Sequence, residues 1–119
     1  MLASLQDGTL MAYDEFLAER VRAAIGARRG IVEKKMFGGL AFMLHGNMAC
    51  GVVGEKLMLR LGEEGAAAAM CEPRVGPMDF TGKPIKSMAF VEPEGLEREE
   101  DLVGWIGKAL DFARALPRK

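Results

Sequence analysis

The sequence predicts a single α+β domain, in which two outer helices pack on one antiparallel sheet. Three observations lead to this prediction. Apolar residues recur at three- and four-residue steps near both ends of the 119-residue chain, which is typical of amphipathic helices. Residues 33–61 instead alternate and carry glycine-rich turns. No internal repeat or long linker divides the chain, so we expect two layers in the order α-β-β-β-α-β-β-α.

The first helix is expected over residues 13–28. Asp14 is placed to cap its N-terminus, and Glu15 suits the positive end of the helix dipole. Its apolar face is formed by Phe16, Leu17, Val21, Ala24 and Ile25. Gly26 weakens the last turn and Gly30 ends the segment.

A three-stranded meander is expected to follow. Residues 33–45 are interpreted as one long strand with a bulge or bend at Gly38-Gly39. His45-Gly46-Asn47 is a tight hairpin signal, because glycine and asparagine tolerate a positive φ. A second strand is expected over residues 48–53 and a third over residues 56–61, with a turn at Gly54-Glu55 between them.

The second half adds a short helix, two strands and a long helix. The alanine-rich residues 62–71 predict the short helix, which Pro73 stops. Residues 74–86 are loop-like, apart from a short strand at 78–80 and a turn at 81–84. A strand over residues 87–92 precedes a helix over residues 98–116. On this helix Trp105 lies in the apolar stripe, so we expect it to be largely buried.

Composition indicates an ordinary folded domain. Half of the residues are apolar and 28% are charged. There are 16 basic and 17 acidic residues, so the basic excess typical of nucleic-acid-binding proteins is absent. No run of 18 apolar residues predicts a membrane span. Residues 1–10 lack the features of a signal peptide and are interpreted as a disordered or frayed leader before one domain over residues 11–119.

No set of residues with the spacing of a catalytic centre stands out. His45 is the only histidine, and it is expected in a hairpin turn. Cys50 and Cys71 are interpreted as reduced thiols of a cytoplasmic protein. No metal-ligand spacing and no phosphate-binding loop is found, so we expect neither a catalytic site nor a cofactor. An alternative remains open: a small enzyme or ligand-binding protein with a site near Asp79, His45 and Cys50.

A second alternative is a nucleic-acid-binding module that uses basic residues 20–35. Its bases are Arg20, Arg22, Arg28, Arg29, Lys34 and Lys35. They could contact a phosphate backbone, although a solvated helix face explains them as well. Aromatic residues interleaved with the bases would favour nucleic acid, but only Phe37 lies close by. Direct nucleic-acid binding is therefore not expected.

Three stretches together resemble a known family. They are residues 11–16 (MAYDEF), residues 34–43 (KKMFGGLAFM) with Gly46-Asn47-Met48, and residues 78–84 (MDFTGKP). The chain resembles the TfoX (Sxy) N-terminal domain family over residues 11 to about 117. The resemblance implies a cytoplasmic bacterial α+β domain with a secretion-chaperone-like arrangement. The founding members regulate natural competence and are thought to act as coactivators with the catabolite activator protein at promoters.

Some members of this family carry a second, helical domain. This chain ends at Lys119, so it resembles the stand-alone members. The family supplies no catalytic residues to carry over. The resemblance implies a non-enzymatic regulatory domain whose partner is a protein, with the transcription machinery as the candidate and no role for a membrane.

The first predicted strand is apolar on both sides. If the alternation survives the glycines, Met36, Leu40, Phe42 and Leu44 share one side, and Phe37, Ala41 and Met43 share the other. Seven of the nine methionines lie between residues 36 and 88, and methionine is over-used at partner-binding surfaces. A sheet with helices on one side leaves its other face open. We therefore expect a homodimer, or a surface for a protein partner, formed by Lys35, Phe37, Gly38, Gly39, Met43, Met58 and Arg60.

Overall fold

The computed structural model describes residues 13–36, 38–79 and 84–119. The predicted leader, Phe37 and most of the turn at residues 81–84 lie outside these residues. The helices are α2 (Glu15–Ile25), α3 (Gly62–Ala69) and α4 (Glu99–Arg114), with a 3₁₀ turn η1 (Pro93–Gly95). The strands are β1 (Ile31–Met36), β2 (Gly39–Leu44), β3 (Asn47–Val53), β4 (Lys56–Arg60), β5 (Val75–Asp79) and β6 (Pro84–Val91).

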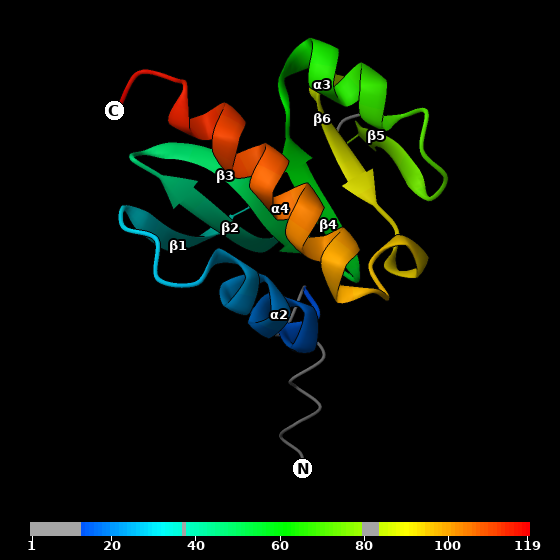
Figure 1. Ribbon diagram of the computed structural model, residues 1–119, viewed down its shortest axis with the longest axis horizontal. Helices are drawn as coiled ribbons and strands as arrows, with labels where there is room; N and C mark the ends of the chain where they lie inside the picture. The colour runs from blue at the N-terminus through cyan, green and yellow to red at the C-terminus, as the bar shows by residue number, and fades with distance from the viewer. Residues whose placement is uncertain (1–12, 37, 80–83) are drawn as a thin grey trace.

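The predicted α+β class is confirmed. The strands form one antiparallel sheet in the order β1-β2-β3-β4-β6-β5. Figure 1 shows α4 crossing the sheet diagonally, with α2 beside it on the same side. Helix α3 contacts β6 near the end of the sheet. The order of elements broadly matches the prediction, with one strand more than expected.

The additional strand arises because residues 33–45 form two strands instead of one. Strand β1 pairs with β2 from Ile31↔Leu44 to Met36↔Gly39, so the chain reverses between Met36 and Gly39. Gly38 has a φ of 72°, a conformation that glycine adopts at low cost and that tight hairpin turns require. The reversal also places Met36 on the same side of the sheet as Met43. The expected grouping of Met36 with Leu40 was wrong for this reason.

Residues 74–86 were predicted as loop-like apart from a short strand at 78–80, but most of the described residues in this range belong to strands. Strand β5 begins at Val75 and continues through Gly76 and Pro77, while β6 begins at Pro84. Proline cannot donate to a neighbouring strand, but β5 lies at the edge of the sheet and needs hydrogen bonds on one side only. Gly76 and Pro77 therefore do not end the strand, contrary to the expectation from their usual place in turns.

Other local predictions are confirmed. The Asp14 carboxylate accepts hydrogen bonds from the backbone N–H groups of Phe16 (2.8 Å) and Leu17 (3.2 Å) and caps α2. His45 and Gly46 form the expected turn between β2 and β3, with φ values of 52° and 84°. Helix α2 ends at Ile25, three residues earlier than predicted, because Gly26 takes a φ of 68°.

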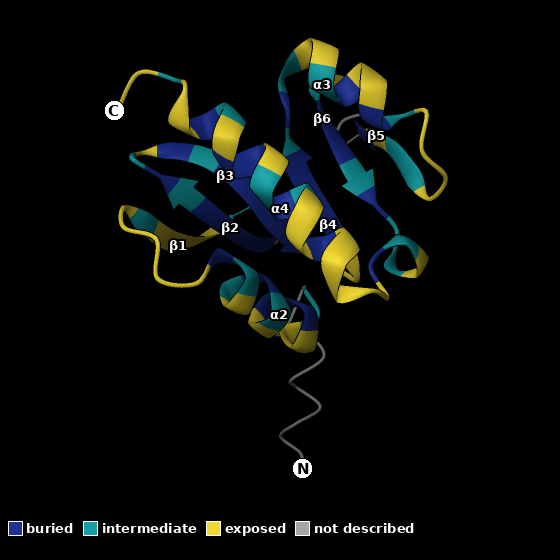
Figure 2. Ribbon diagram, in the orientation of Figure 1, coloured by how far each residue is buried: buried dark blue, intermediate teal, exposed yellow. Residues whose placement is uncertain are grey.

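The main core lies between the sheet and the two long helices. From the sheet it includes Leu40, Phe42, Cys50, Val52, Leu57, Leu59 and Val91; from the helices it includes Leu17, Val21, Ile25, Leu102, Ile106 and Leu110. Figure 2 shows this buried layer beneath α2 and α4. Arg20 Nη2 of α2 donates to the carbonyl oxygen of Leu96 at 2.6 Å and lies 3.4 Å from Glu99. These contacts join α2 to the start of α4.

The expectation that Trp105 is largely buried needs correction. Trp105 packs against the main core but stays partly exposed. The reason is its place on α4, where one side of the ring faces a groove instead of the sheet.

We expect Phe42→Ala to destabilise the fold by about 3–5 kcal/mol, because Phe42 is fully buried and its truncation leaves a cavity. The matched control is Phe16→Ala, since 73% of the Phe16 surface is exposed and we expect a change within about 0.5 kcal/mol. Urea titration of both variants measures the difference. Equal stability of the two variants would contradict the assignment of this core.

Candidate interaction surface

The side of the sheet opposite α2 and α4 carries most of the methionines. We call it the methionine face and define it by Met36, Met43, Met48, Val53, Met58, Met78, Met88 and Phe90. The strand register places Met43 beside Met48 and Met58 beside Phe90. Met58, Met78 and Met88 form a second buried cluster, against which Met48, Val53 and Phe90 pack. Among the described residues, every member of that cluster comes from a strand.

A β-bulge in β3 separates the two faces. Phe42 pairs with Cys50, whereas Met43 pairs with Met48, so Ala49 is an extra residue in β3. Ala49 and Cys50 both belong to the main core. The bulge thus turns Phe42 and Cys50 toward the helices and leaves Met43 and Met48 side by side on the methionine face.

Two apolar hollows lie at the ends of the second cluster. One holds about 410 Å³ beside Phe90 and Val53, next to Lys56 and Pro93. The other holds about 500 Å³ between α3 and the β5–β6 pair, where Met70, Ile85 and Met88 line it. Met43, Met48, Val53 and Phe90 are half-buried, whereas Met58 is only 1% exposed. The accessible part of this face is therefore formed by the half-buried residues, of which Met48, Val53 and Phe90 pack against the buried cluster of Met58.

The structure does not gather all of the predicted partner-binding residues into one surface. Met43, Met58 and the buried Gly39 lie on the methionine face. Lys35 pairs with Leu40 and so points to the opposite side of the sheet. Arg60 pairs with Met88 of the methionine face, while its guanidinium lies 5.8 Å from the ring centroid of Phe112 in α4. Gly38 is exposed in its turn, and Phe37 lies outside the described residues.

The residues of the alternative enzyme site come from different parts of the sheet. His45 lies in the turn between β2 and β3, and Cys50 lies within β3 and faces the helices. Asp79 is in β5, three strands from β3, which is about 14 Å at the usual strand spacing. Burial raises the pKa of the Cys50 thiol to about 12, so this thiol stays protonated near neutral pH. Asp79 and Cys50 therefore belong to well-separated strands of the sheet.

The basic residues of the nucleic-acid alternative are partly engaged by acids. Arg22 contacts Glu33 at 2.7 Å and Glu19 at 3.0 Å, and its hydrogen bond to Glu33 raises its pKa. Arg20 is held by Leu96 and Glu99. Arg28, Arg29, Lys34 and Lys35 are exposed. Two of the six bases are thus fixed within the fold.

A further feature escaped the sequence analysis. Trp105, Gly104 and Lys108 of α4 line a groove of about 610 Å³ together with Arg74 and residues of η1. The glycines at 104 and 107 within a helical pattern were the available signal, because glycine is unfavourable inside a helix.

Within the described ranges, no group of three or more histidine, cysteine or acidic side chains is placed to hold a metal ion. No helix in this part of the chain is long and apolar enough to cross a membrane.

Comparison with known proteins gave one match. A family model described as the TfoX N-terminal domain matches residues 23–113, which covers most of the chain and includes every strand. No curated protein and no solved structure matches the chain.

The two cysteines should differ sharply in reactivity. We expect iodoacetamide at pH 8 to modify Cys71, which is exposed, and to leave Cys50 unmodified in the folded protein, because alkylation requires an accessible thiolate. Mass spectrometry of peptides gives the extent of modification at each site. In denaturant both should react, and equal modification of the native protein would contradict the burial of Cys50.

Proposed function

The chain belongs to the TfoX N-terminal domain family, and from that premise we propose that it is a non-enzymatic regulatory domain that binds other proteins, in the manner of a transcription coactivator. Family membership supports a regulatory, competence-associated role. The transcription machinery is the candidate partner. Direct binding to nucleic acid is not required, since the chain carries 16 basic and 17 acidic residues and Arg20 and Arg22 are engaged by acids.

The observation that carries this proposal is the methionine face. The helices α2 and α4 cover the other side of the sheet, and Met43, Met48, Val53 and Phe90 remain half-buried at the surface. An antiparallel sheet that meets water on one face usually presents polar residues there. Methionine adapts to an opposing surface at low cost, because its side chain is unbranched and polarizable.

The occupant that we assign to this face is a second copy of the chain. The sheet has six strands of five to eight residues, so its face measures roughly 500–700 Å². Two such faces would bury roughly 1,000–1,400 Å², near the lower end of stable interfaces. The net charge of −1 opposes the approach of two copies only weakly. A two-fold axis lets the same patch serve both subunits.

Dimerisation should fail when a charge is placed on this face. We expect the protein to sediment at twice the mass of one chain at micromolar concentration. Met43→Glu should shift it to the monomer, because each subunit would then bury an unpaired carboxylate in the interface. The matched control is Val103→Glu, which adds the same charge at a 45%-exposed position on α4. A protein that stays monomeric at all concentrations, or equal effects of the two variants, would contradict the assignment.

The regulatory role needs a separate test. The wild-type chain and Met43→Glu can each be used as bait in cross-linked native lysate, followed by mass spectrometry. Recovery of RNA polymerase or a promoter-bound activator with the wild type supports the coactivator role. If transcription proteins do not exceed background with either bait, that role is wrong, whatever the sedimentation experiment shows.

A further inference from the structure

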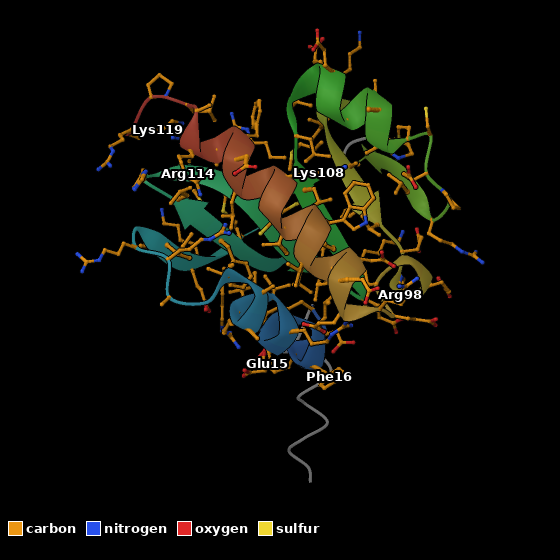
Figure 3. The ribbon with its side chains drawn as sticks, viewed as in Figure 1. Glu15, Phe16, Arg98, Lys108, Arg114 and Lys119 are labelled. Atoms are coloured by element: carbon orange, nitrogen blue, oxygen red, sulfur yellow. The ribbon has the colours of Figure 1, made fainter. Side chains whose placement is uncertain are left out.

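A second surface lies on the helix-covered side of the molecule, and we call it the Trp105 groove. Its larger part, of about 610 Å³, runs between α4, η1 and the segment before β5. Its smaller part, of about 420 Å³, continues between α3 and α4. Trp105, Lys108 and Glu72 line both parts. Figure 3 shows Lys108 leaving α4 on the side that faces α3.

The groove carries an excess of negative charge. Five carboxylates line it, against the two cations Arg74 and Lys108; the acids are Glu72, Glu94, Glu100, Asp101 and Asp111. Glu100 is paired with Arg98, the residue before α4, and Asp111 is paired with Arg114 within α4. Within the described residues the carboxylates of the other three acids make no ion pair. They are therefore free to meet a cationic ligand.

A cation of the chain itself already lies against the aromatic ring in this groove. The Lys108 ammonium lies 5.1 Å from the centroid of the Trp105 ring, within the range of a cation–π interaction. Lys108 is exposed, so its flexible side chain can leave the ring at small cost. An ammonium or guanidinium group of a ligand would find the same ring face and the same acidic surroundings.

The backbone of α4 is also open at this surface. A Cβ atom built at Gly104 or Gly107 would meet nothing within 4 Å, so packing inside the chain does not require glycine at either position. Glycine is less favourable than alanine inside a helix. Gly104 lines the groove, where a missing side chain lets another backbone approach closely.

From these observations we propose that the Trp105 groove binds a lysine- or arginine-bearing segment of a protein partner, one of whose cations replaces Lys108 on the Trp105 ring while others meet Glu72, Glu94 and Asp101. The proposal rests on the proposed function, since it names the chemistry of a protein partner. It uses a different surface from the methionine face, so the two can fail separately.

Trp105 is the only tryptophan in the chain, so its fluorescence reports on the groove directly. We expect a synthetic lysine–alanine peptide to change this fluorescence saturably, with weaker binding at higher salt. The same peptide with glutamate in place of lysine should have no effect. No response to the lysine peptide, or equal responses to both peptides, would overturn the proposal. So would equally tight binding of free spermidine, since a small polyamine would then account for the site.

Variants give the sharper test. Glu94→Gln and Asp101→Asn should each weaken peptide binding about two- to fivefold, whereas Glu64→Gln, an exposed acid of α3 outside the groove, should leave it unchanged. Lys108→Met should tighten binding about two- to fivefold, because it removes the competing cation from the ring. Unchanged binding in Lys108→Met would contradict the exchange of cations.

A variant of the helix separates binding from stability. Gly104→Ala should shift the urea midpoint to a higher concentration and yet weaken peptide binding, because the new methyl group enters the groove. Increased stability with unchanged affinity would contradict close approach at Gly104. Met43→Glu should bind the peptide like the wild type, because loss of the dimer would leave the groove unchanged.

Discussion

A single layer of helices covers a sheet whose two faces are both apolar, and the rest of the structure depends on this constraint. One face is buried by α2 and α4. On the other face Met58 and Met78 are almost fully covered, and among the described residues the buried cluster that contains them consists of strand residues. The terminal methyl of Met58 lies 2.6 Å from where a Cβ of Gly51 would stand. The side chain therefore lies along the sheet, and glycine at position 51 leaves room for it.

Helix α4 is held in place by polar contacts at its start and beyond its end. At its start, Arg20 of α2 contacts Leu96 and Glu99. Beyond its end, the buried Asn47 donates to the carbonyl oxygen of Pro117 at 2.8 Å, and the Lys119 N–H donates to the carbonyl oxygen of His45 at 3.0 Å. These bonds satisfy polar groups of the β2–β3 turn. They also set the direction in which α4 crosses the sheet, and with it the position of Trp105.

The sequence predicted the elements whose signals are local. Asp14 indicated a helix start, and His45-Gly46 indicated a hairpin. The turn between β1 and β2 was missed because Met36, Phe37 and Leu40 keep the segment apolar on both sides of two glycines, a pattern that fits a bend as well as a reversal. The methionine surface was predicted with Met43 and Met58 among its members, whereas Met48, Met78 and Met88 were not assigned to it. The groove at Trp105 was not predicted, because Arg74 and η1 also line it and only the folded chain brings them next to α4.

The two proposed surfaces lie on opposite sides of the sheet, since α4 carries the Trp105 groove and the methionine face is turned away from α4. A dimer formed through the methionine faces would therefore present two Trp105 grooves on its outer sides. A partner with two basic segments could engage both, and the second contact would then be intramolecular. Loss of the dimer would in that case lower the avidity for such a partner without changing the affinity of one groove for one segment.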